Sequence, residues 1–230
     1  MKFAQRPVAK AINAQRTAFW LTAAAVASAI ALSASPARAE STFISGAGTA
    51  TARLNFSIVI PKFVFLQVGT GSSLATNAAI DTILFDMTGA VTSVGNGTAQ
   101  AGTGGDLLAG SVTARVLGNN FTAAVNLSAT TTGAMSNGTN TISWSEISVA
   151  APTAIAVTPA AASTLSHPGT LLAPFADGAA TTVSLTPVAR VINQAAKWTF
   201  SYKNTNVPPS GTYGNTVANN GQVTYSIAMP

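Results

Sequence analysis

The sequence predicts an all-β protein, folded as an antiparallel β-sandwich. Beyond residue 39, apolar and polar residues alternate in a series of short stretches, and this period of two is typical of strands that bury one face. Clusters of Gly, Asn and Pro separate the stretches and predict turns. No stretch of about ten or more residues in this part of the chain has helical spacing. Together these observations favour a sheet protein over any helical class.

Residues 1–39 have the three zones of a cleaved export signal. The first zone is basic and contains Lys2, Arg6, Lys10 and Arg16. Residues 18–32 follow as a mainly apolar run, shorter than the roughly 20 residues that cross a bilayer, which disfavours a permanent membrane anchor. The small-residue cleavage signature at 37–39 predicts a mature chain that begins at Glu40 and is exported through the periplasm.

The longest alternating stretch is 49–60, which comes soon after the predicted cleavage site. Its apolar positions are Ala50, Ala52, Leu54, Phe56, Ile58 and Ile60. At roughly 3.3 Å per residue the stretch would span about 40 Å, around twice the length of a common strand. Pro61 then removes one ladder donor and interrupts the strand. We therefore divide the mature chain into a leader with a candidate donor strand, 40–60, and a β-sandwich domain, 61–230.

Shorter predicted strands fill the rest of the chain. They lie at 63–68, 80–87, 108–117, 121–129, 142–149, 182–188, 197–203, 212–217 and 222–229. Asn-containing turns at 118–120 and 219–221 predict two hairpins, and a shift of apolar parity near Ser145 and Glu146 predicts a bulge. The stretches 88–106 and 150–180 are predicted loops, the second with room for one short strand. Many short strands with turns between them are typical of an immunoglobulin-like sandwich with Greek-key connections.

The charge of the mature chain excludes several kinds of partner. Five of the eleven basic residues lie in the predicted signal, so six basic residues remain against six acidic ones. A neutral chain with scattered charges cannot form the basic stripe that nucleic acid or an anionic membrane surface requires. We expect no nucleic-acid partner and no stable membrane insertion. The sequence has no cysteine, so stability must come from the core and from partners.

The residues that usually carry catalysis are almost absent, and we expect no enzyme and no cofactor. His167, the only histidine, precedes Pro168 in a predicted loop and is expected to be exposed. The carboxylates are too few and too scattered to form an acid–base pair. Residues 102–107 resemble one copy of a calcium-binding Gly-Asp repeat, but such sites need stacked copies, so we expect no metal site.

The two ends of the mature chain resemble the major pilins of the colonisation-factor (alternate) class of chaperone-usher fimbriae. Those subunits begin with an alternating strand that runs through a proline into an apolar strand, as TATARLNFSIVIPKFVFLQV does here. They end with a Gly-x-Tyr-x-x-x-Val segment before a terminal alternating strand, as 211–217 precedes 222–229 here. The resemblance covers roughly 40 residues. The long Ala/Pro-rich loop and the Asn219–Gly221 turn depart from the family's pattern.

The resemblance implies a sandwich that lacks one strand and takes the N-terminal strand of the next subunit into its groove. This is donor-strand complementation, a form of strand addition to an open sheet edge. The implied donor residues are Ala50, Ala52, Leu54, Phe56, Ile58 and Ile60. The implied partners are identical or related subunits joined head to tail, a periplasmic chaperone and an outer-membrane usher. The implied role is a structural subunit of a cell-surface fimbria for adhesion or biofilm.

The alternative is a self-contained secreted or surface β-sandwich that binds glycan or matrix. In that case the first strand would be tucked into its own sheet, whereas a pilin would leave it unpaired in a single chain. Trp144, Trp198, Phe200 and Tyr202 could then line a sugar site. At their strand-like spacing, however, we expect these residues to belong to the core.

Overall fold

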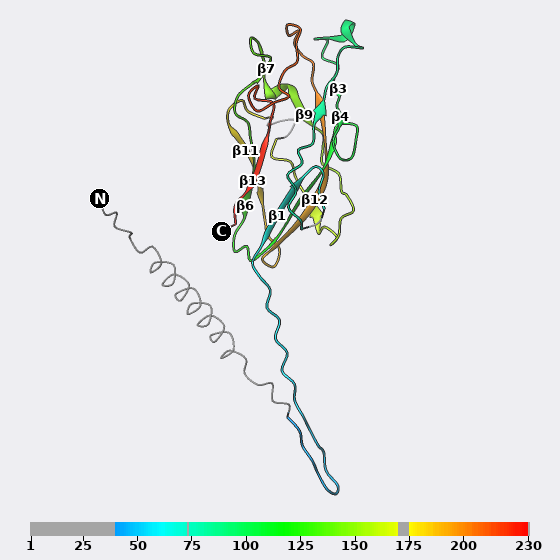
Figure 1. Cartoon of the computed structure of the whole chain (residues 1–230), viewed down its shortest axis with the longest axis vertical. Coiled ribbons are helices and arrows are strands. Elements are labelled where there is room, and N and C mark those ends of the chain that lie inside the picture. Colours follow the sequence, from blue (N-terminus) through cyan, green and yellow to red (C-terminus); the bar gives the residue numbers. More distant parts are fainter. Residues whose placement is uncertain (1–39, 73, 170–174, 230) are drawn as a thin grey trace, which may run out of the picture. The chain divides into compact units, whose positions relative to one another are not determined.

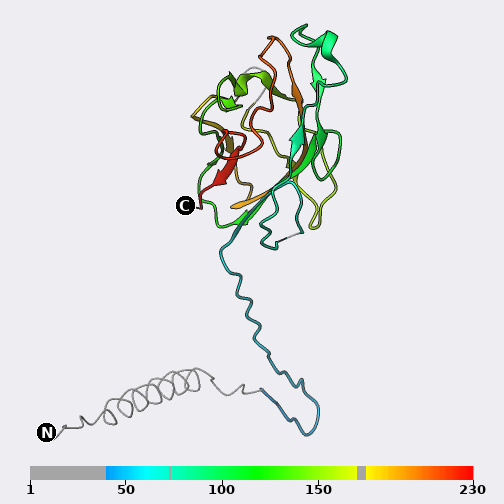
Figure 2. The same cartoon turned by 45° about the horizontal axis from the view of Figure 1, so that its top comes forward.

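A computed structural model describes residues 40–72, 74–169 and 175–229 (Figures 1 and 2). The predicted export signal, 1–39, lies outside the described residues. By backbone contacts the chain divides between Val59 and Ile60 into two units, which we describe separately. Within the described ranges no helix has the length and hydropathy of a membrane span.

The larger sheet of the second unit has six strands and is built around two long central ones. β5 (Ser111–Asn119) and β12 (Val191–Tyr202) pair antiparallel over nine residues. β1 (Val64–Val68) pairs with the other edge of β5. The short strands that pair with β12 are β3 (Gln100–Ala101), β9 (Ile147–Val149) and β10 (Ser163–Thr164), of which only β10 is parallel.

A three-stranded antiparallel sheet faces the same core. Its central strand is β6 (Val125–Thr130), with β11 (Ala180–Leu185) on one side and β13 (Thr224–Ile227) on the other. Figure 1 shows these three strands together on one side of the unit, with β1 and β12 on the other. Smaller elements are β2 (Ile83–Leu84) with β4 (Thr103–Gly104), β7 (Met135–Ser136) with β8 (Thr141–Ile142), and the 3-10 turns η1 (Val91–Ser93) and η2 (Trp144–Glu146).

Side chains from both larger sheets form one hydrophobic core. Leu127, Ala129 and Leu185 come from the three-stranded sheet and are at most 2% exposed. From the six-stranded sheet the core takes Val112, Ala114, Val116, Ile192, Ala196, Trp198, Phe200 and Tyr202. The described chain is thus nearly all β with almost no helix, which confirms the all-β prediction. The inward positions predicted for Trp198, Phe200 and Tyr202 are also confirmed.

The predicted hairpin across residues 118–120 is wrong in its pairing. β5 and β6 exist close to their predicted places, but they lie in different sheets and do not pair with each other. Asn119 is still part of β5, where it lies opposite Val191 on β12, and its side chain binds the backbone of Pro61 and Phe63. The Phe121 ring instead folds back over β5, so closely that a Cβ on Gly118 would lie 2.8 Å from it.

The second predicted hairpin is also absent. Residues 212–217 form no strand, and Asn219 and Gly221 donate backbone hydrogen bonds to Thr216 in a local turn. Only β13 remains of this pair, and it pairs with β6 instead. Of the predicted strand 80–87, only Ile83–Leu84 pairs. The predicted loop 88–106 contains η1, β3 and β4.

The parity shift near Ser145 and Glu146 has a different cause from the predicted bulge. The chain turns there through η2, whose N-cap Ser143 accepts a hydrogen bond from the Ser145 backbone N–H. This single 3-10 turn rotates the chain between β8 and β9. The place of the break was therefore predicted, but its structure was not.

Candidate subunit interface

The segment Thr49–Ile60 forms no strand in the described chain, although its sequence alternates as a strand does. Its large apolar side chains are exposed: Leu54 by 73%, Phe56 by 86% and Ile58 by 86%. Ala50, Ala52 and Ile60 are exposed as well. A strand needs a ladder partner, and an apolar face of this size is favourable only when something covers it. The segment therefore has the pattern of a buried strand without the burial.

The leader before this segment doubles back on it. The Arg53 guanidinium donates to both carboxylate oxygens of Glu40, at 2.8 and 3.0 Å, and the Thr42 hydroxyl donates to the Thr51 carbonyl oxygen at 2.6 Å. The ion pair lowers the pKa of Glu40 and raises that of Arg53. Both groups are at the surface, where such pairs contribute little, so this contact sets a local shape and leaves the segment free to rearrange.

β1 is an edge of the six-stranded sheet, and its inward side chains are incompletely covered. It pairs only with β5 among the described strands. Val64, Leu66 and Val68 pack against the core but are only half-buried. Val116 and Ala114, which lie opposite Leu66 and Val68 on β5, are fully buried. The core is therefore only partly shielded from solvent at this edge of the sheet.

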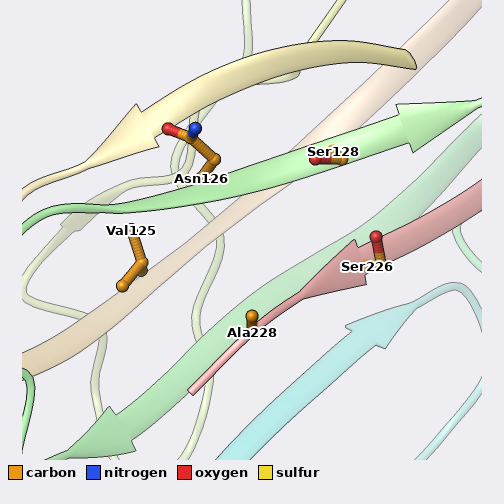
Figure 3. Close-up of a pocket in the computed structure, with 5 residues that line it drawn as sticks. All are labelled: Val125, Asn126, Ser128, Ser226 and Ala228. Atoms are coloured by element: carbon orange, nitrogen blue, oxygen red, sulfur yellow. The ribbon is translucent and has the colours of Figure 1, made fainter. Parts of the chain in front are cut away.

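β13 is an edge of the three-stranded sheet, with the same incomplete cover. Among the described strands it pairs only with β6. Its inward residues Tyr225 and Ile227 are half-buried, whereas Leu127 and Ala129 on β6 are buried. β1 and β13 come within 8 Å between Cα atoms, yet no ladder joins them. Figure 3 shows that the two strands, pale cyan and pale red, run in opposite directions.

His167 is buried beneath β13, which corrects the prediction that it is an exposed loop residue. It is 2% exposed, and its ring packs edge-on against Phe175, Trp198, Phe200 and Tyr225. Its Nε2 lies 2.8 Å from the Tyr225 hydroxyl, and its Nδ1 lies 2.8 Å from the Gly169 backbone nitrogen. Burial lowers the pKa of His167 to about 4 and raises that of Tyr225. Both are therefore neutral at pH 7 and brace the strand at the open edge.

The other sequence candidates occupy structural positions. Trp144, Trp198, Phe200 and Tyr202 are all buried in the core and present no aromatic surface to a sugar. The Asp106 carboxylate, in the Gly-rich stretch, accepts a hydrogen bond from the Thr113 backbone at 2.8 Å. The described residues contain no group of three side chains that could hold a metal ion.

One open hollow lies on the outward face of the three-stranded sheet. It has a volume of about 380 Å³ and is lined by Val125, Asn126, Ser128, Ser226 and Ala228 (Figure 3). Asn126 and Ser128 come from β6, and Ser226 comes from β13. These residues are small and uncharged, and they offer no acid, base or nucleophile pair for catalysis.

Comparison with known proteins adds no assignment. No family model matches the chain, and neither the curated proteins nor the solved structures contain a match. Function must therefore be argued from the geometry of this chain.

Sequence reasoning identified Thr49–Ile60 but missed the two edges and the buried histidine. Alternation in β1 and β13 shows which side chains point inward, but it does not show which strand edges remain unpaired. His167 lies in a stretch without period, so no pattern marked it as core. The alternating aromatic residues of β12 predicted a buried face. They gave no indication that His167, which is distant in sequence, packs against that face.

Proposed function

We propose that this chain is a structural subunit of a fimbria that polymerises by donor-strand complementation. In this proposal the second unit is an immunoglobulin-like sandwich that lacks one strand, and Thr49–Ile60 of another copy supplies it between β1 and β13. The proposal rests on one combination of features in the same chain. The chain has an exposed, unpaired apolar segment and also two unpaired edges with half-buried inward side chains over one core.

Burial of the apolar face of the segment would stabilise a complex between subunits. Burying Leu54, Phe56, Ile58 and Ile60 would contribute roughly 1.5 to 3 kcal/mol per side chain. Backbone hydrogen bonds to β1 on one side and β13 on the other would give further stabilisation. Alternation would fix the register, because a slip by one residue would turn every apolar side chain out to solvent.

The short connection between the segment and β1 favours a donor from another copy. Between Ile60 and β1 lie only residues 61–63, and they are held at the end of β5: Phe63 donates to the Asn119 side chain at 3.0 Å, and the Asn119 amide donates to the Pro61 carbonyl oxygen at 2.9 Å. A chain that reversed there would lie antiparallel to β1 and hence parallel to β13, which runs the opposite way (Figure 3). Any strand between β1 and β13 is antiparallel to one of them and parallel to the other, so strand direction does not decide which copy supplies it. The short connection, held at both ends by Asn119, is what favours a donor from another copy.

The two edges must separate to receive a strand. Strands that flank a shared neighbour lie about 9.5 Å apart, which is twice the usual spacing, whereas β1 and β13 come within 8 Å between Cα atoms. The half-buried side chains of β1 and β13 must then pack against the donor strand. We expect the filled state to be the better packed of the two.

Each subunit in this proposal gives one strand and receives one, so the contact is head to tail and produces an open filament. An unfilled edge with apolar side chains aggregates, so a periplasmic chaperone would cover it before an outer-membrane usher assembles the fibre. The chain would leave through the periplasm and function at the cell surface in adhesion or biofilm. It would need no catalytic residue and no cofactor.

Light scattering on two forms of the chain tests the proposal. One form begins at Glu40 and the other at Pro61, and the second is measured with and without a peptide of residues 49–60. We expect polymers from the first form, and a second form that is unstable alone but becomes a stable monomer with peptide. A lasting monomer from the first form, with no exchange on long incubation, would favour the self-contained binding module instead.

A further inference from the structure

Two basic side chains lie at the end of the second unit where the segment Thr49–Ile60 joins it, and we call this end the base. Arg190 immediately precedes β12, whose first residue pairs with Asn119, the last residue of β5. Lys62 lies in the connection 61–63, which the Asn119 side chain binds at both ends. Both basic side chains are exposed. The base therefore presents two positive charges.

Arg190 is held in a strained backbone conformation. It forms a two-residue turn with Ala189, and the flanking Val188 and Val191 exchange two backbone hydrogen bonds of 2.9 Å. Both turn residues have a positive φ, 48° for Ala189 and 66° for Arg190, where Asn and Gly are the usual residues. The Arg190 guanidinium also donates to the Asn120 side-chain oxygen at 2.5 Å, which orients it. An arginine at such a position favours a role for its charge.

The opposite end of the second unit, which we call the far end, is acidic. Asp86 follows a phenylalanine whose ring lies 6.3 Å from that of the last residue of β12. Just beyond β12, the Lys203 backbone N–H donates to the Glu146 carbonyl oxygen at 2.7 Å. Asp177 accepts a hydrogen bond of 2.8 Å from the backbone of the first residue of η2, which ends at Glu146. The far end thus has three carboxylates against one lysine.

The remaining charged side chains of the second unit cancel near the middle of the sheet. Asp106 accepts a hydrogen bond from the Thr113 backbone, and Asp81 binds the backbone next to the residue that donates to the Thr113 carbonyl oxygen. Lys197 lies opposite Thr113 on β12, and Arg115 is two residues along β5. The twelve residues of β12 span roughly 40 Å, several times the screening length of about 10 Å at 0.1 M salt. The charges at the two ends therefore do not neutralise each other within one copy.

We infer that the base of each copy docks on the far end of the copy that receives its strand, so that opposite charges meet. The inference rests on the proposed function and adds the direction in which the donor runs. The facing exposed side chains are Lys62 and Arg190 on one copy and Asp86 and Asp177 on the other.

The short connection decides where the base must lie. Residues 61–63 span at most about 10 Å, so the base of the donating copy stays close to the place where its donor leaves the acceptor. β1 runs from the base toward the far end, because its first residue pairs near the end of β5 and its last residue pairs near the middle. A donor parallel to β1 leaves at the far end, where the charges attract. A donor antiparallel to β1 leaves at the acceptor's own base, where the like charges of two bases repel.

Neutralising the base tests the inference. Light scattering follows polymerisation of the chain from Glu40 after dilution from urea, for wild type and for Lys62→Gln combined with Arg190→Asn. The control combines Thr182→Glu with Ser184→Glu, which lowers the net charge by the same amount at exposed positions on the side of the unit. At about 0.02 M salt we expect the base variant to polymerise about tenfold more slowly than wild type, and the control to stay within about twofold. About 0.5 M salt should slow wild type to the rate of the base variant. Asn suits the left-handed backbone at position 190, so the melting temperature of the monomer should not fall.

An exchange of charges identifies the partner. Copies with Lys62→Glu and Arg190→Glu are acidic at both ends, and copies with Asp86→Lys and Ala176→Lys are basic at both ends. Each form alone should polymerise slowly at low salt, whereas their mixture should approach the wild-type rate by alternating the two forms. A base variant as fast as wild type, a control slowed as much as the base variant, or a mixture no faster than its components would overturn the inference and leave the proposed function standing. The absence of polymers from every form at every salt concentration would overturn both.

Discussion

The Nε2 atom of His167 lies 2.8 Å from the hydroxyl oxygen of Tyr225 and ties the long connection between β9 and β11 to the last strand. The imidazole also packs edge-on against Trp198, with ring centroids 4.5 Å apart. Tyr225 is on β13, the strand whose free edge would receive a donor. A buried neutral pair thus supports one wall of the proposed acceptor site.

Acid should weaken the fold through His167. Burial lowers its pKa to about 4 from an ordinary value near 6.5, so the unfolded chain binds the proton more tightly. The stabilisation is complete above about pH 6.5 and is lost as the pH falls toward 4, by about 3 kcal/mol in total. Urea unfolding at pH 7, 5.5 and 4.5 measures this change. His167→Gln should remove most of the pH dependence above pH 5, and an equally steep dependence in that variant would contradict the assignment.

Removing the Tyr225 hydroxyl should destabilise the second unit. Tyr225→Phe leaves His167 Nε2 without this partner in a buried site, which costs about 1 to 3 kcal/mol. Tyr213→Phe is the matched control, because the Tyr213 hydroxyl donates to the Pro209 carbonyl oxygen at an exposed position. We expect the control to change the free energy of unfolding by less than about 0.5 kcal/mol. Equal effects of the two substitutions in thermal unfolding would count against the bracing role.

Asn204 should hold the loop around η1 in place. It is fully buried, its amide oxygen accepts from the Gly95 backbone at 2.7 Å, and its amide nitrogen donates to the Ser93 carbonyl oxygen at 2.8 Å. Its φ of 58° also favours Asn over Ala. We expect Asn204→Ala to cost about 2 kcal/mol and to speed proteolytic cleavage in 88–99. Asn206→Ala, at an exposed neighbour, should leave the cleavage rate near wild type, and cleavage unchanged in both variants would disprove this role.

A charge on the apolar side of the donor segment should stop assembly without harming the monomer. Phe56→Asp places a carboxylate where the proposed donor enters a core, while Phe56 itself is 86% exposed in the single chain. We expect polymers to be lost and the melting temperature of the monomer to stay within about 1 °C. Ser57→Asp, on the opposite side of the same strand pattern, should still polymerise. The proposal fails here if both variants polymerise equally well.

The sequence predicted strands better than it predicted partners. β12 was evident from Trp198, Phe200 and Tyr202, because alternation of large aromatics requires a buried face. β5 and β6 were also expected, yet their assignment to two sheets was not, since alternation fixes a face but not a neighbour. His167 was missed because its burial depends on contacts with distant β12 and β13, which no local pattern encodes. The alternating segment 49–60 could be recognised because its period is independent of any partner, and its role as a donor stays a prediction.

Disulfide trapping between two copies tests the central proposal most directly, because the sequence contains no cysteine. One copy has a cysteine at Leu54, Phe56 or Ile58, the other at Ile227 on β13, and the two are mixed during assembly under mild oxidation. The proposal predicts covalent dimers only in the mixture, strongly for one donor position and weakly for its neighbours, as a fixed register requires. Dimers would then be absent when the donor cysteine is moved to Ser57. No cross-link from any of the three donor positions, in polymers that form normally, would contradict it.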